Sequence, residues 1–566
     1  MKISQRCFRW SVCASILVLT TFAVAARAAE PRTAAIISIA DLDSTIKSLK
    51  AVTEQVGYPN ALAQVEMGLA IVQGLDTKQP IGIVVQANET AISGYAFLPI
   101  SDVSATPLGQ LVAMGEKQKD GSILIPPTPP FLPQLYIKQT SKWLFVSVQE
   151  LPGKLPDDPS KLLEGLNKQY ILSVKANVSN LPEELTLSGL TLLRNLAEQQ
   201  AQTEADIETI DAQFDTLETL LTELKTFVFG IAVTPENDIV IDTIAEALPG
   251  TTLSGDMTAA ANAKTNWIGF YQPKDAIFTL ISCDVLNAQV KKQLQTQLKA
   301  FFEGAREGIK DGDAEIDVDA AATVLDNLQA VLASSVEPGK IDFGTTWKAD
   351  GTLLAGLTIT DGKKLQAAIE KIVAAAPEEF KQYIKPNDSK LGDYIVSTIA
   401  VPVSELPNAE NLPELANKTV NVHVAVKDNA LVLALGITDT VLGDLKKAID
   451  ASQTATPLPE KRAVVTLGNV GNVFNLFFGT EEIKDNKQYE QILEIWASFP
   501  KDAQITLSLK SEGNAETNKM VISNKLLPGL GKLIGMLPIG PTARSPMQSS
   551  EFDFDEEPEE EVNRPE

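Results

Sequence analysis

The chain carries the same succession of elements twice, and this repetition constrains its fold more than any other feature. Near the end of the first half, two alternating apolar segments, 227–233 and 238–247, flank a turn and run into Leu248-Pro249-Gly250. Near the end of the second half, segments 504–510 and 519–524 flank a polar loop and run into Leu527-Pro528-Gly529. Two closing hairpins of this kind predict a tandem arrangement of similar units.

The elements before these hairpins also follow one order: strand–helix–helix, hairpin–helix, hairpin–helix, strand–helix–helix. The strands and hairpins of the first half are expected at 34–39, 80–98, 135–149 and 169–178, and those of the second at 276–283, 341–359, 419–435 and 463–467. Identity between the halves is low, so a chance match of a generic order is the alternative. The sequence predicts an α+β fold: two tandem similar units of mainly antiparallel sheet, with amphipathic helices packed on one face.

The first 28 residues read as a secretory signal peptide. Lys2, Arg6 and Arg9 precede an apolar stretch, and Ala26-Arg27-Ala28 fits a signal peptidase site. The apolar stretch is shorter than the roughly 20 residues of a transmembrane helix, so an uncleaved anchor is the less favoured alternative. The predicted divisions are therefore a signal peptide at 1–28, a first α+β unit at 29–255, a second at 256–538, and a disordered acidic tail at 539–566.

Charge limits the possible partners. The signal peptide carries four basic residues and no acids, which leaves the mature chain 44 basic and 73 acidic side chains and a net charge of −29. Such a chain is repelled by nucleic acid and by anionic membrane surfaces. We expect an exported protein, periplasmic or extracellular, which is not an integral membrane protein and has an unknown protein or cell-envelope partner and no nucleic acid partner.

Histidine and cysteine, which often serve in catalysis and metal binding, are rare in this chain. His423 is the only histidine, and it shares a strand face with Asn421 and Ala425, which predicts a partly solvated, non-catalytic residue. Cys283 is the only cysteine outside the signal peptide, so no intramolecular disulfide is expected. It ends an apolar strand without a cationic neighbour, which favours a buried and inert thiol over a reactive one.

The segment 311–319 places an acid at every second position. An EF-hand loop that began at Asp311 would need glycine and glutamate where Ile316 and Ala322 stand. The motif therefore fails. A solvated connection whose last aspartates cap the next helix is favoured, and loose calcium binding is the alternative.

One predicted helix has a pronounced apolar face. The residues on this face recur at spacings of three and four: Ile207, Ile210, Phe214, Leu217, Leu221 and Leu224. Eight acids and no basic residue lie between Arg194 and Lys225. The pattern fits an amphipathic helix packed on its own sheet, or else a short coiled-coil site for a partner.

No P-loop, nucleophile elbow, H-E-x-x-H motif or dinucleotide fingerprint is present. Carboxylate pairs are too numerous among 73 acids to have evidential value. We therefore predict a secreted, non-catalytic binding or structural protein with no catalytic, cofactor-binding or metal-binding residues and no cofactor. The alternatives are an extracytoplasmic carrier of an apolar ligand and, less favoured, a carboxylate-dependent hydrolase.

Two segments resemble known sequences. Residues 158–168, which run into the strand at 170–178, and residues 339–372, which include GTTWKADGTLLAGLTITDGKKLQAAIEKI, are similar to stretches of large secreted proteins of unknown function found in planctomycete bacteria. The resemblance implies export and a shared fold. It implies no activity and no site residues.

Overall fold

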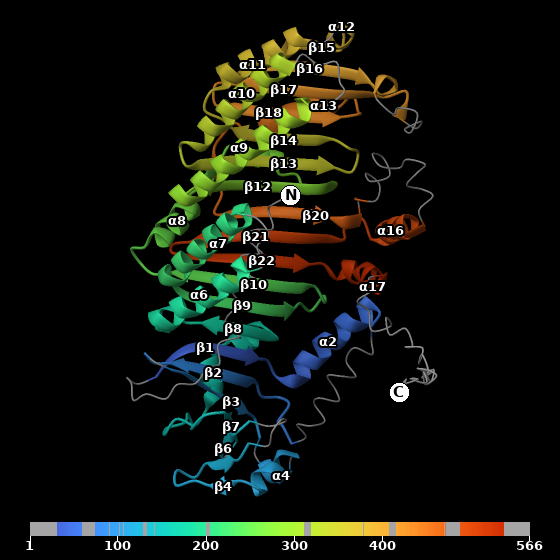
Figure 1. The fold of residues 1–566 in the computed structure, drawn as a ribbon. Coiled ribbons are helices and arrows are strands. Elements are labelled where there is room, and N and C mark those ends of the chain that lie inside the picture. The colour runs from blue at the N-terminus through green and yellow to red at the C-terminus, as the bar shows by residue number, and fades with distance from the viewer. Residues whose placement is uncertain are drawn as a thin grey trace, which may run out of the picture.

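The computed structural model describes residues 31–536, apart from 59–73, 90, 101, 106, 128–132, 141, 200–203, 311–317, 377, 407–414, 469 and 471–486. These residues form one large antiparallel sheet of 20 strands (Figure 1) and a small sheet of β11 (Lys264–Thr265) and β19 (Thr456–Pro457). The α+β class and the antiparallel sheet agree with the prediction.

The strands of each half follow one another outward from the centre of the sheet. In the first half the order is β10 (Ile239–Ala247), β9 (Leu224–Val233), β8 (Leu172–Ala176), β1 (Arg32–Ile39), β2 (Ile81–Ala87), β3 (Ile92–Leu98), β7 (Leu144–Ser147), β6 (Leu135–Gln139), β5 (Ile123–Ile125) and β4 (Glu116–Lys117). In the second half it is β22 (Ala515–Ile522), β21 (Gln504–Glu512), β20 (Glu460–Thr466), β12 (Ala276–Val285), β13 (Lys340–Lys348), β14 (Leu353–Thr358), β18 (Ala430–Gly436), β17 (Thr419–Lys427), β16 (Tyr394–Pro402) and β15 (Ile384–Leu391).

The two halves join edge to edge. Strands β10 and β22 pair antiparallel along their length, from Ile239 opposite Ile522 to Glu246 opposite Ala515. We call this pairing the seam. Because of it, a single sheet runs through both halves of the chain.

The helices connect the strands and line both strand ends (Figure 1). Those of the first half are α2 (Leu42–Val56), α4 (Pro107–Ala113), α5 (Leu166–Gln169), α6 (Glu183–Glu198), α7 (Glu204–Glu223) and α8 (Thr252–Ala261). Those of the second half are α9 (Ala288–Lys310), α10 (Val318–Val336), α11 (Gly362–Ala375), α12 (Glu378–Lys381), α13 (Val441–Asp450), α16 (Lys487–Ser498) and α17 (Leu527–Met536). Aspartates cap α2 and α11: Asp41 accepts a hydrogen bond from the amide of Ser44, and Asp361 accepts one from the amide of Lys364.

Helices pack on both faces of the second half. Leu365 and Ile369 of α11 join Val426 of β17 in one core cluster, whereas Leu445 of α13 joins Ala425 in another. Neighbouring residues of a strand point to opposite faces, so α11 and α13 lie on opposite sides of β17. The expectation that helices cover a single face is wrong in this part of the sheet.

A buried tryptophan fixes the chain across β13 and β14. Trp267 is 2% exposed, and its indole Nε1 donates to Thr358 Oγ1 at 3.0 Å. A Cβ atom at Gly356 would lie 2.2 Å from the Trp267 ring, so this position needs glycine. The buried carboxylate of Asp342 accepts from Thr265 Oγ1 at 2.6 Å and holds the segment before the tryptophan.

The outermost strands were not predicted. They are β4 and β5 at one end of the sheet and β15 and β16 at the other. The strand β15 contains Pro386, and its pairing with β16 shifts register between Lys385 and Ser389. Several predicted segments lie outside the described residues: the signal peptide, the helix at 60–72, residues 311–317 of the acidic run, nearly all of the helix at 470–478, and the acidic tail.

Candidate functional site

His423 is buried, which corrects the expectation of a partly solvated residue. Its side chain is 7% exposed, and Nδ1 lies 3.1 Å from Thr398 Oγ1 of β16, which donates to Asp388 Oδ2 of β15. The α13 core covers the same face of the sheet through Ala425, so no wet face exists here. Burial lowers the pKa of the imidazole, and the nearby Asp388 carboxylate only partly opposes this shift.

Cys283 is fully buried in β12, as predicted. Its thiol donates to the Lys264 carbonyl at 3.5 Å. Burial, followed by the neighbouring Asp342 carboxylate, raises the pKa of the thiol to about 11. A thiol with this pKa is almost fully protonated at neutral pH, which opposes a role as nucleophile or metal ligand.

The acidic helix α7 packs mainly on its neighbour α6. Arg194 of α6 donates to Asp215 of α7 at 2.5 Å, and its guanidinium lies 5.9 Å from the centre of the Phe214 ring. Near the end of α7, Leu220 and Leu221 pack against the sheet cluster around Phe227. Ile207, near the start of the helix, is 41% exposed.

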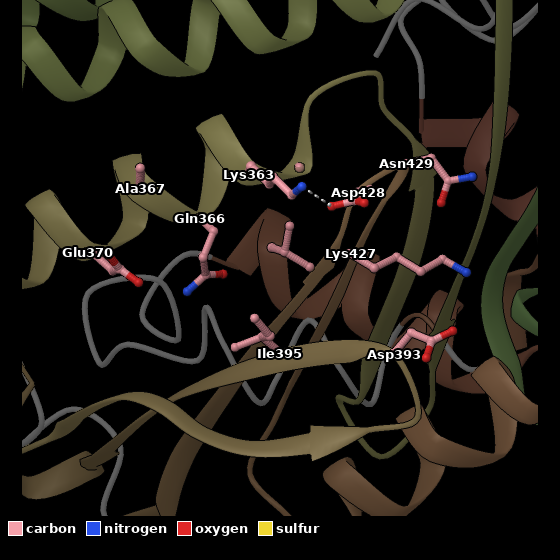
Figure 2. Close-up of a pocket in the computed structure, with 11 residues that line it drawn as sticks. Lys363, Gln366, Ala367, Glu370, Asp393, Ile395, Lys427, Asp428 and Asn429 are labelled. Carbon is pink, nitrogen blue, oxygen red and sulfur yellow. Dashed lines mark ion pairs between the residues drawn. The ribbon is translucent and has the colours of Figure 1, made fainter.

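A cavity of about 550 Å³ opens between α11, the start of β16 and the β17–β18 turn. Figure 2 shows Lys363, Gln366 and Glu370 of α11 on one side and Lys427–Asn429 on another. Lys363 and Asp428 face each other at 3.9 Å, yet their side chains are 86% and 78% exposed. The Lys427 ammonium lies 4.7 Å from the centre of the Tyr394 ring.

This cavity has the volume of a small-molecule site but not its chemistry. Its charged groups stand at an open rim, and Lys427 extends away from Glu370 in Figure 2. The carboxylates Glu370, Asp393 and Asp428 are all exposed. Neither His423 nor Cys283 lines the cavity. The residues that the sequence singled out are therefore not brought together here.

A row of apolar side chains crosses the centre of the sheet on one face. Each member stands opposite the next across seven adjacent strands, in the order Ile81, Ile39, Leu172, Ile231, Ile241, Met520 and Leu507. We call this row the apolar strip. All seven residues are half-buried or exposed, and Leu172 is 38% exposed. With strands about 4.8 Å apart, the strip is about 29 Å long.

The strip lies between two regions where the same face of the sheet packs against helices. At one end of the strands, Phe227 and Ala245 pack with α7 and α8, and at the other, Ile505 and Ile522 pack with residues of α16 and α17. Figure 1 shows α7 and α8 on one side of the central strands and α16 and α17 on the other. Beyond Leu507 the row continues as Ala463 and Leu280, which are 5% and 7% exposed. The row is therefore not buried from Ile81 to Leu507 and is buried beyond Leu507.

The opposite face of the centre carries a polar cluster among apolar side chains such as Val240 and Val521. There Asp242 of β10 stands opposite Lys519 of β22, and the Tyr170 hydroxyl donates to Asp242 Oδ2 at 3.2 Å. Burial raises the pKa of Asp242 against the opposing influence of Lys519 and Tyr170. Burial and the Asp242 carboxylate raise the pKa of Tyr170 to about 12. This face is also the better covered one, since Ile36 and Val84 on it are 3% and 1% exposed.

Among the residues that the structure describes, no three His, Cys, Asp or Glu side chains gather closely enough to hold a metal ion. In the same residues, no helix combines the length and apolarity needed to cross a bilayer. Comparison with known proteins gives no matching family model, no matching curated protein and no matching solved structure.

Proposed function

We propose that this chain is an exported, non-catalytic binding protein whose ligand surface is the apolar strip. The observation that carries the proposal is the row of seven apolar side chains that are not buried although they occupy the centre of a large sheet. An antiparallel sheet normally covers its apolar face, and a contiguous exposed apolar patch usually marks a binding surface. Of the alternatives that the sequence left open, the carrier of an apolar ligand fits this surface best.

The strip favours a ligand with few polar groups. Its inner strands β1, β8, β9, β10, β22 and β21 are each paired on both sides, so their backbone groups are already hydrogen-bonded within the sheet. A peptide could not add to them as a further strand. A ligand on the strip therefore contacts side chains, and those of the strip are hydrocarbon or thioether.

A hydrolase is less well supported. The three carboxylates of the open cavity are exposed, whereas a general acid at neutral pH needs the raised pKa that burial gives. The half-buried Asp242, whose pKa is raised, is hydrogen-bonded to Tyr170. It is not among the residues that line the cavity.

The proposal includes a tandem origin for the scaffold, with units at 29–255 and 256–538. Its support is the strand order, because β10-β9-β8-β1-β2-β3-β7-β6-β5-β4 and β22-β21-β20-β12-β13-β14-β18-β17-β16-β15 place corresponding hairpins at corresponding positions. The closing strands of the two halves are the ones that meet at the seam. Export follows from the signal-like sequence at 1–28 and agrees with the resemblance to secreted proteins.

The test uses the uncharged fluorescent probe N-phenyl-1-naphthylamine. We expect the folded protein to enhance its fluorescence and Leu172→Gln to weaken binding by about tenfold or more, because an unpaired amide would enter an apolar contact. The matched control is Met114→Gln, which changes a 69% exposed apolar side chain outside the strip and should leave binding unchanged. Folded wild-type protein that does not enhance the fluorescence would overturn the proposal.

A further inference from the structure

We infer that the ligand of the apolar strip is an uncharged single-chain lipid, with its acyl chain across β2, β1, β8 and β9 and its polar head beside Thr243 and Asn518 at the seam. This inference rests on the proposed function and adds the chemistry and orientation of the ligand. Three observations carry it: the length of the strip within the first half, the polar residues beside one end of this length, and the charges around them.

The part of the strip that lies in the first half suits one acyl chain. From Ile81 to Ile241 the strip crosses five strands, which corresponds to about 19 Å at the usual strand spacing. Half of a bilayer hydrocarbon core, which one acyl chain fills, measures about 15 Å. A second apolar row lies beside the strip over β2, β1 and β8 and consists of Ile83, Ile37 and Val174. An acyl chain bound over the first half would therefore contact two parallel rows of apolar side chains.

This second row becomes polar at the seam. Beyond Val174 it continues through Phe229 to Thr243 of β10 and Asn518 of β22, which stand opposite each other. Both side chains are half-exposed and lie on the same face as Ile241 and Met520. A hydroxyl and an amide are uncharged donors and acceptors, and they suit a head group with hydroxyl or ester oxygens.

The surrounding charges oppose an anionic head. The acidic helix α7 forms the wall on the Phe227 side of the strip, and the whole chain carries a net charge of −25. Along the same row, Lys461 follows Leu509, and its ammonium is already paired with Asp284 Oδ1 at 2.5 Å. Glu516 of β22, two residues before Asn518, lies on the same face of the sheet and is half-buried. A carboxylate or phosphate head at the seam would therefore meet the Glu516 carboxylate and, further along the row, a lysine that already has a partner.

The experiment is displacement of N-phenyl-1-naphthylamine from full-length protein by monoolein or by sodium oleate, at pH 7.5 and below the aggregation concentration of each. The two lipids share an acyl chain and differ in head group. We expect monoolein to displace the probe at a concentration at least about tenfold lower than that of oleate. Because the two lipids share an acyl chain, this difference reports on the head group alone. Oleate that displaces the probe as well as monoolein does would overturn the inference.

The position of the head is tested with the double variant Thr243→Val with Asn518→Leu. It should lose the preference for monoolein over oleate and still bind the probe, which has no such head. The conservative pair Thr243→Ser with Asn518→Gln should retain the preference, and thermal unfolding checks that each variant is folded. A preference that survives in the hydrophobic double variant would contradict the placement of the head.

The outcomes also separate the two proposals. Wild-type protein that binds no probe contradicts the proposed function itself. Probe binding that depends on Leu172, combined with equal displacement by oleate and monoolein, leaves the proposed function intact and removes only the inference about the lipid class.

Discussion

One imidazole is buried and does not line the described cavity, and its surroundings determine how it responds to pH. His423 faces Thr398 of β16 and Asp388 of β15, and Ala434 of β18 stands opposite it on the other side. Burial is the main influence on its pKa, which is lowered. The native fold therefore favours the neutral ring.

This pKa shift predicts a loss of stability in mild acid. The unfolded chain binds a proton on His423 near pH 6.5, whereas the folded chain does so only at lower pH. As the pH falls from 7.5 to 5, protonation therefore favours the unfolded state and lowers the free energy of unfolding. We expect His423→Gln to reduce this fall, measured by urea unfolding at a series of pH values. Parallel curves for the two proteins would count against a buried neutral histidine.

The side of the strand on which His423 lies follows from the alternation of residues 420–426. Its burial does not, because that depends on α13 and Trp267, which lie elsewhere in the chain and pack on the same face. The exposure of the apolar strip likewise depends on where the helices pack. Alternation placed Phe227, Phe229, Ile231 and Val233 on one face, and only Phe227 among them is fully buried. Local pattern indicates the face, and the helices decide how well it is covered.

At the scale of elements, hairpins with strong alternation were predictable. The strands β13 and β14, joined through Ala349-Asp350-Gly351, are an example. The strand β15 is largely polar, contains a proline and is exposed along most of its length, so it offers no alternation to detect. The apolar run of β16 was a usable strand signal that the prediction left unassigned. The strand β4 has only two residues, too few for any periodicity.

The packing of Trp267 on β13 and β14 makes an element-scale prediction. Gly356→Ala would bring a methyl group against the indole, and we expect a loss of about 1–3 kcal/mol from overpacking. Gly443→Ala is the matched control, because nothing lies within 4 Å of that position in α13. Alanine is also the better helix former there by about 0.5–1 kcal/mol. Thermal unfolding compares the two, and a Gly356 variant as stable as wild type would show that the indole can move aside.

At the scale of the whole molecule, the continuity of the sheet could not be read from the sequence. Hairpin signals are local, whereas the seam pairs β10 with β22, which are more than two hundred residues apart in the chain. The sequence indicated two cores and gave no sign that their closing strands meet. The strip is hidden from sequence reasoning for the same reason, since Ile241 and Met520 become neighbours only across the seam.

Because the sheet is continuous, both halves should respond to a change at the seam. Val240 is 6% exposed and stands opposite Val521. Val240→Ala removes two buried carbon groups and should cost about 2 kcal/mol. We expect calorimetry to show one unfolding transition that moves as a whole to lower temperature. Two transitions, of which only one moves, would mean that the halves unfold independently.

The seam also lowers the number of edge strands. Two separate sheets would have four outer strands with unpaired backbone groups, and such strands tend to recruit further chains. In the part of the chain that the structure describes, joining β10 to β22 leaves two, β4 and β15. One of these has only two residues, and the other is interrupted by Pro386 and a register shift. The two edge strands of this 20-stranded sheet are therefore short or irregular. This opposes edge-to-edge pairing between copies of the chain and so opposes the formation of fibres.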